Sequence, residues 1–147
     1  MAKKFVFELE SALRLKTYAV QKAKEHLAQI IEQISNTTNT ISDLQSELAS
    51  LQNNLPIGKQ SAIILIHQWQ YQTSLVQIIN KNEKQLQQLN EIAAVRQKAL
   101  VTALQDEKIY LKLKEKKQIL HKNLENREEQ LFLDEIGQQI AIRNRQK

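Results

Sequence analysis

Lysine side chains crowd one short stretch of the sequence and are its clearest candidates for a chemical role. The cluster comprises Lys108, Lys112, Lys114, Lys116 and Lys117, in a chain of formal net charge +5. A local basic stretch attracts an acidic protein surface, nucleic acid or lipid headgroups, whereas on a solvated helix it has no partner at all. Interleaved acidic residues, few arginines and the lack of a recognised module argue against nucleic acid. An acidic protein surface, lipid headgroups and a solvated helix face are the interpretations left open.

The side chains that usually catalyse reactions or bind metals are isolated from one another. None of the three histidines has a second histidine three or four residues away; they are His26, His67 and His121. The chain has no cysteine, and its two glycines do not form a phosphate-binding loop. The adjacent carboxylates at 128–129 and 134–135 lie in a helical pattern that offers no pocket. We therefore expect no enzymatic activity, no cofactor and no metal site.

Apolar residues recur at seven-residue intervals through the first third of the chain, and they indicate the element that carries them. The main series is Val6, Leu13, Val20, Leu27, Ile34, Ile41, Leu48 and Leu55. A second series follows three residues later, at Leu9, Ala23, Ile30, Leu44 and Leu51. This alternation of three and four places both series on one narrow helix face, which is typical of a coiled coil. Lys16 and Thr37 interrupt the second series, and the Ser35–Thr40 run predicts a soft spot rather than a break.

The one strong break contains Pro56 and Gly58, which favour a turn. We expect a helix over 5–51, a turn over 52–60 and a second helix over 61–143, all within a single coiled-coil domain spanning 1–147. The predicted fold is all-α: a long antiparallel two-helix coiled-coil hairpin whose second helix is longer than the first. No apolar run approaches the roughly 20 residues that span a bilayer. We therefore expect a cytoplasmic protein without membrane insertion.

The unequal helix lengths predict an overhang at the C-terminal end. With a turn near residue 57, Val6 would lie opposite about residue 108, and helix from about Leu113 onward would have no intramolecular partner. That stretch carries Leu113, Leu120, Leu124 and Leu131 on one face, beside the lysine cluster. An isolated amphipathic helix is marginal in water, so it implies an external partner or self-association. Trp69 and Tyr71, just past the turn, are either a protein-binding anchor or tip packing.

Three sequence segments together resemble the FliJ family of the flagellar type III export apparatus, whose injectisome counterpart is the YscO family. The first is Phe5–Glu10 followed by Leu13–Lys16, and the second lies between Ser61 and Ile79 and includes Gln68, Gln70, Tyr71 and Leu75. The third is Leu133–Ile136 followed by Arg143, and it departs from the family pattern at Gly137, where Ala is usual. The resemblance covers nearly the whole chain.

The resemblance implies a rod similar to the central stalk of rotary ATPases. Such a rod is monomeric alone and binds the hexameric export ATPase, the cytoplasmic domain of the export gate and export chaperones at the inner-membrane export apparatus. The implied ATPase contacts are Lys112, Lys114, Lys116, Lys117, Leu120, Leu124 and Leu131. The implied chaperone and gate patch is Leu44, Leu48, Tyr71, Leu75 and Ile78, to which the position of Trp69 at the tip adds that residue. Leu44 and Leu48 also lie on the seam, which favours core packing for those two. The alternative is a structural coiled coil that homo-oligomerises or tethers partners without a secretion role.

Overall fold

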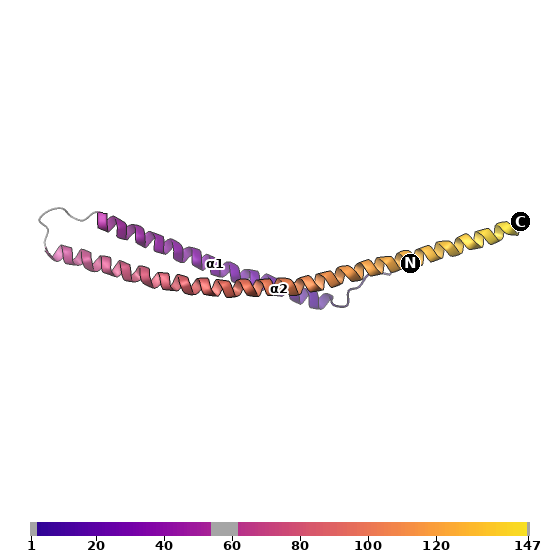
Figure 1. Ribbon diagram of the computed structural model, residues 1–147, viewed down its shortest axis with the longest axis horizontal. Coiled ribbons are helices and arrows are strands. Elements are labelled where there is room, and N and C mark those ends of the chain that lie inside the picture. The colour runs from indigo at the N-terminus through magenta and orange to yellow at the C-terminus, as the bar shows by residue number, and fades with distance from the viewer. Residues whose placement is uncertain (1–2, 54–61, 147) are drawn as a thin grey trace. The chain divides into compact units, whose positions relative to one another are not determined.

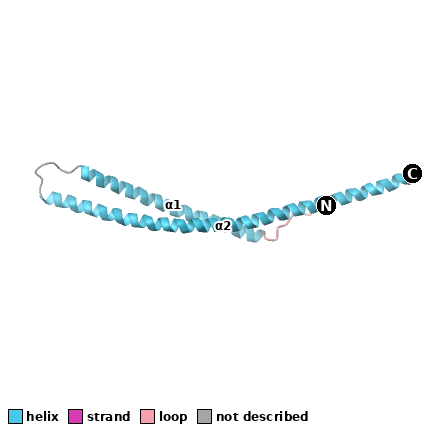
Figure 2. Cartoon of the chain, viewed as in Figure 1, coloured by secondary structure: helices cyan, strands magenta, loops and turns pink. Residues whose placement is uncertain are grey.

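Two long α-helices make up nearly all of the structure, a computed structural model that describes residues 3–53 and 62–146. Helix α1 spans Glu10–Asn53 and helix α2 spans Ala62–Arg145, with 44 and 84 residues (Figure 1). No strand occurs within the described residues (Figure 2). The predicted all-α hairpin with a longer second helix is confirmed. The expected turn at Pro56 and Gly58 lies outside the described residues.

The chain divides into two compact units, each of which contains part of both helices. The central unit comprises residues 21–102, and the terminal unit comprises residues 1–20 together with 103–147. Contacts between the helices show an antiparallel arrangement within each unit. In the central unit, for example, His26 of α1 contacts Arg96, whereas Glu47, farther along α1, contacts Tyr71, farther back on α2.

The core of the central unit is the predicted seam. Ile30 and Ile41 of α1 are buried, and so are Leu75, Ile79 and Leu89 of α2. The other seam positions of α1 in this unit are half-buried, namely Ala23, Leu27, Ile34, Thr37, Leu44, Leu48 and Leu51. On both helices these positions alternate at spacings of three and four, so each side chain packs against the facing helix.

The run of poor helix formers in α1 does not interrupt the helix. The Thr38 hydroxyl donates a hydrogen bond to the Ile34 carbonyl at 2.7 Å, and the Thr40 hydroxyl donates to the Asn36 carbonyl at 2.9 Å. Both bonds satisfy side chains that otherwise compete with the backbone. Because Ile34 and Ile41 hold the seam on either side, the helix continues through this run.

Among the polar residues at half-buried seam positions of α2 in the central unit, Arg96 and Asn82 each donate a hydrogen bond to a backbone carbonyl, but to carbonyls of different helices. The Arg96 Nη1 group donates to the backbone carbonyl of His26 on α1 at 2.7 Å, so it links the two helices. The Asn82 Nδ2 group donates instead to the Ile78 carbonyl within its own helix at 2.9 Å. Polar groups at such positions need partners because their desolvation is costly.

The N-terminal segment differs from the expected helix, because α1 begins at Glu10 rather than near residue 5. Residues 3–9 contain no helix, and from Phe5 to Glu8 their burial alternates with a period of two before a turn at residues 8–9: Val6 is 76% exposed, whereas Phe7 is 5% exposed. This alternation is that of an extended chain. Val6 therefore does not belong to the seam, and Phe7 is the residue that anchors the segment.

Ion pairs align the two helices of the terminal unit. Glu10 lies 3.0 Å from Lys114, and Lys16 lies 3.8 Å from Asp106. The Lys16 ammonium also lies 5.9 Å from the centroid of the Tyr110 ring. Lys16, which interrupts the apolar seam, is thus matched by an acidic and an aromatic partner on α2.

His121 fixes the extended N-terminal segment to α2. Its Nε2 atom lies 2.8 Å from the Lys3 carbonyl oxygen and 3.1 Å from the Glu125 carboxylate, and its ring lies 5.6 Å from the Phe5 ring. An extended chain advances about 3.3 Å per residue, against 1.5 Å in a helix, so this short segment reaches far along α2. The overhang therefore begins later than the expected Leu113, because the N-terminal segment still contacts α2 at His121 and residues 126–146 are the exposed stretch that follows Glu125.

Candidate partner-binding surfaces

The predicted lysine cluster separates into one structural residue and several accessible ones. Lys114 is half-buried and paired with Glu10 across the helices, so it belongs to the packing of the terminal unit. Lys112, Lys116 and Lys117 are exposed on α2. The accessible positive charge that remains lies on one short stretch of helix, which suits it to an acidic surface.

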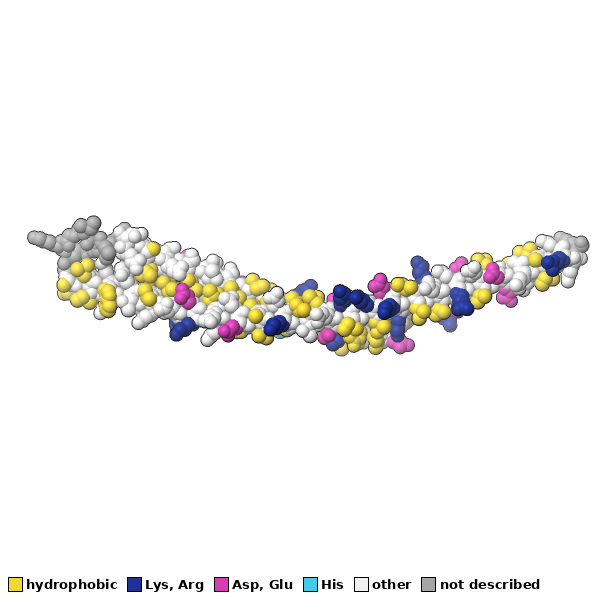
Figure 3. Space-filling model, in the orientation of Figure 1, with side chains coloured by type: hydrophobic (Ala, Val, Ile, Leu, Met, Phe, Trp, Pro, Cys, Tyr) yellow, Lys and Arg dark blue, Asp and Glu magenta, His cyan; other side chains and the backbone are white. Residues whose placement is uncertain are grey.

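The three predicted leucine contacts are all accessible. Leu120, Leu124 and Leu131 each expose more than half of their surface. The C-terminal part of α2 carries further large apolar residues that the sequence interpretation did not name as partner contacts, namely Phe132, Leu133, Ile136, Ile140 and Ile142. Figure 3 shows apolar and basic side chains interspersed along this part of the molecule. Exposed apolar side chains at this density mark an interaction surface.

These apolar residues occupy two different faces of α2. Each residue advances about 100° around a helix, so Phe132, eleven residues after His121, lies on nearly the same face as His121. His121 contacts the N-terminal segment. Leu120 and Leu131 lie roughly 80–100° to one side of that direction by the same rule. The predicted leucine contacts are therefore not a continuation of the intramolecular seam. They form a separate stripe beside it.

The second predicted patch, near the start of α2, also divides between core and surface. Leu75 is 3% exposed and Leu44 and Leu48 are half-buried, so these three pack in the seam of the central unit. Trp69, Ile78 and Tyr71 are exposed, as are four neighbouring residues that the prediction left out: Ile63, Ile64, Leu65 and Ile66. We call the exposed set the tip surface. Figure 3 shows apolar side chains gathered there, at the end of α2 that follows the undescribed residues.

The hydroxyl of Tyr71 is tied to the other helix. It donates a hydrogen bond to the Glu47 carboxylate of α1. This bond, followed by desolvation and the negative charge of Glu47, raises the pKa of the phenol above its ordinary value of 10.0. The neutral phenol is therefore the form that bridges the helices at physiological pH, and this contribution is lost only as the pH rises through the raised pKa. The bond orients the ring while leaving it exposed.

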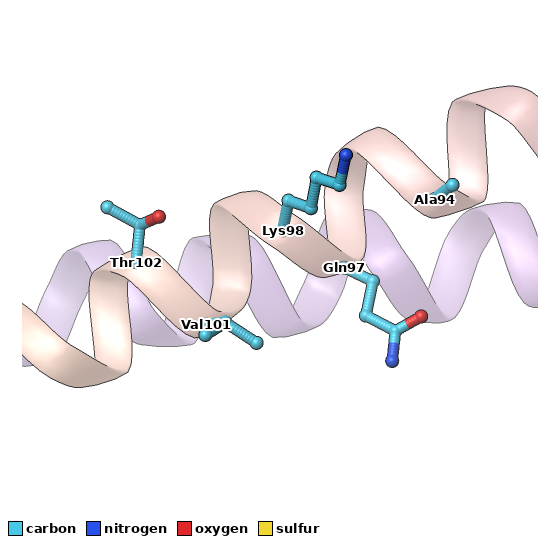
Figure 4. A pocket seen from close by; sticks show the side chains of 5 residues that line it. All are labelled: Ala94, Gln97, Lys98, Val101 and Thr102. Carbon is cyan, nitrogen blue, oxygen red and sulfur yellow. The ribbon is translucent and has the colours of Figure 1, made fainter.

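Within the described residues, a shallow groove lies on α2 and is lined by Ala94, Gln97, Lys98, Val101 and Thr102 (Figure 4). All five residues belong to the same helix, so no second element closes over a ligand there. Among the described residues, no cluster of histidine and carboxylate side chains is suited to hold a metal ion. Neither described helix has a stretch long and apolar enough to cross a membrane.

Comparison with known proteins places the chain in one family. The family described as flagellar FliJ protein matches residues 5–146, which is nearly the whole chain. Searches of curated proteins and of solved structures found no match. The family is a non-enzymatic component of protein export, and a paired helical hairpin with exposed surfaces suits such a role. The chain therefore belongs to the FliJ family of flagellar proteins and is a component of the flagellar export apparatus.

Proposed function

We propose that this protein is a stalk-like rod that binds the hexameric export ATPase, promotes its activity and links it to the export gate and to export chaperones. In this proposal it works in the cytoplasm, peripherally associated with the inner-membrane export apparatus. The observation that supports the proposal best is the helix beyond Glu125, in which every described residue is exposed and large apolar residues are frequent. Such a helix gains most of its stability from a partner.

The accessible lysines and leucines divide the work of binding the ATPase. Lys112, Lys116 and Lys117 steer the approach to an acidic lining, because charge complementarity mainly increases the association rate. Leu120, Leu124 and Leu131 then supply apolar contact area, which mainly slows dissociation. In this proposal the association rate depends on salt concentration, whereas the dissociation rate does not.

A matched pair of charge variants tests this proposal by titration of the hexameric ATPase. The triple variant Lys112→Glu, Lys116→Glu and Lys117→Glu is expected to reach half-maximal stimulation at a concentration roughly tenfold higher at low salt. The control replaces three exposed lysines of the central unit by glutamate: Lys81, Lys84 and Lys98. Both variants change the net charge equally. Equal loss of stimulation in the two variants would reject a localised ATPase contact.

The tip surface is proposed to bind chaperones or the gate independently of the ATPase. Tyr71→Ala removes an exposed aromatic ring and is expected to weaken that binding by about 1–3 kcal/mol. Tyr71→Phe keeps the ring but loses the hydrogen bond to Glu47, so its binding should stay near the parent value. Calorimetric titration with a chaperone and thermal melting of both variants check this. A melting temperature that falls in parallel with binding would instead assign Tyr71 to packing of the helices.

A further inference from the structure

An eleven-residue apolar repeat runs along α2 outside the hairpin seam. It consists of Ile109, Leu120, Leu131 and Ile142, which are 64%, 60%, 61% and 55% exposed. Eleven residues make three turns at 3.67 residues per turn, so the four side chains form a nearly straight stripe on a helix. The seam that pairs α2 with α1 follows the seven-residue period instead. The two periods mark two different packing surfaces.

The stripe is exposed even where α2 already has an intramolecular partner. Ile109 lies next to Tyr110, which contacts Lys16 of α1, and Leu120 lies next to His121, which contacts Lys3. The N-terminal segment and α1 therefore leave this face uncovered. At 1.5 Å per residue the stripe is about 50 Å long. An apolar surface of this length on a single helix calls for a partner of similar length.

The uniform spacing makes the stripe complementary to a second copy of itself. When two copies run antiparallel, Ile109 of one lies opposite Ile142 of the other, and Leu120 lies opposite Leu131. The arrangement has twofold symmetry, so the same contacts occur twice and the interface closes on two chains. Spacing alone also permits a parallel pair in which each residue faces its own counterpart. The flanking charges distinguish the two arrangements.

The charges that flank the stripe favour the antiparallel arrangement. By the helical period, Lys116 and Asp134 lie along one side of the stripe, and Lys117 and Glu135 lie along the other side. Antiparallel pairing brings Lys116 within one residue of being level with Asp134, and Lys117 within one residue of being level with Glu135. Twofold symmetry doubles these to four pairs of opposite charge. Parallel pairing places Lys116 opposite Lys117 and Asp134 opposite Glu135 on both sides, so two like-charge contacts stand against one matched contact, Arg127 with Glu128.

We propose that the stripe Ile109, Leu120, Leu131 and Ile142 is the interface of an antiparallel homodimer. This inference does not depend on the proposed function, because it rests on the spacing, exposure and charge of these residues alone. It does have a consequence for that function. Leu120 and Leu131 are also proposed ATPase contacts, so the dimer and the ATPase complex exclude each other. In isolation the protein would then be a dimer at high concentration, whereas the family resemblance implied a monomer.

Sedimentation equilibrium of the full-length chain over a range of concentrations tests the dimer. The apparent mass is expected to rise from 17.1 kDa toward twice that value. Reversing Lys116 and Lys117 to Glu should weaken association roughly tenfold or more, and reversing Asp134 and Glu135 to Lys should do the same. Combining all four reversals should restore it, because the charges match again. A monomer at every concentration, or no recovery in the fourfold variant, overturns the proposal.

Engineered cysteines report the direction of pairing, since the chain has none of its own. A mixture of Leu120→Cys and Leu131→Cys proteins is expected to form the mixed disulfide on oxidation much faster than either protein links to itself. Asn126→Cys, on an exposed residue off the stripe, measures the rate of random collision. Faster linkage of each stripe variant to itself would indicate a parallel pair and overturn the antiparallel interface.

Discussion

Replacement of Ile30 by Asp is expected to lower the free energy of unfolding of the central unit by about 3–5 kcal/mol. Ile30 is 3% exposed in the seam, so the substitution buries a carboxylate among apolar side chains and also removes the packing of the isoleucine. Thermal melting followed by circular dichroism at 222 nm measures the loss. The melting temperature should fall by at least ten degrees, a size set by the ratio of about 4–8 °C per kcal/mol for small domains.

The neighbouring residue supplies the matched control. Ile31 is 54% exposed on the same helix, so Ile31→Asp makes an identical chemical change with little burial. It is expected to shift the free energy of unfolding by no more than about 0.5 kcal/mol. Similar melting temperatures for the two variants would contradict the seam described for the central unit.

Removal of residues 126–147 is expected to weaken stimulation of the export ATPase strongly while leaving the hairpin folded, because it removes Leu131 and the exposed apolar residues around and beyond it but keeps Leu120 and Leu124. The described part of this stretch lies beyond Glu125, the last half-buried residue of α2. It carries six large exposed apolar residues, namely Leu131, Phe132, Leu133, Ile136, Ile140 and Ile142. Because its side chains are all exposed, its loss removes no core contact. A coupled ATP hydrolysis assay measures stimulation, and circular dichroism should show the lost helical signal without a lower midpoint for the main transition.

Chaperone binding provides the internal control for this truncation. The truncated chain retains the tip surface, including Trp69 and Tyr71, and should bind a chaperone with the affinity of the full chain. Full stimulation of the ATPase by the truncated chain would rule out the C-terminal part of α2 as the contact. Loss of both activities together would instead show that the two surfaces are not independent.

The seam was predictable from sequence because many apolar residues of α1 share one seven-residue period. From Leu13 to Leu51 every position at the alternating spacings is buried or half-buried, including the polar Lys16 and Thr37. The start of α1 was not predictable in the same way. Phe5, Val6 and Phe7 fit the end of a heptad series as well as an extended segment, and three residues are too few to distinguish the periods.

The starting point of the overhang was placed too early because the N-terminal segment was expected to be helical. That starting point depends on how far the N-terminal residues reach, and an extended segment reaches about twice as far as a helix of equal length. The contacts that fix this reach join Lys3 and Phe5 to His121. Contacts between residues so far apart in sequence leave no local pattern to detect.

The sequence indicated which stretches carry candidate surfaces, but not which of their residues are accessible and which are buried or paired. Leu120, Leu124 and Leu131 are accessible as expected, because they lie off the seam period. Lys114 and Leu75 look equivalent to their neighbours in sequence, yet one is paired with Glu10 and the other is buried. The difference depends on rotation of the helix relative to its partner. The bond from Tyr71 to Glu47 likewise depends on the relative position of two helices.

Arg96 and His121 hold their partners through backbone carbonyls rather than side chains, one contact in each unit. A substitution at His26 or Lys3 leaves the carbonyl acceptor in place, whereas a substitution at Arg96 or His121 removes the donor. The residue that supplies the backbone carbonyl therefore tolerates more substitutions than the residue that supplies the side-chain donor. Divergence at positions 26 and 3 can proceed without a compensating change at positions 96 and 121, so pairwise covariation is a poor guide to the alignment of these helices.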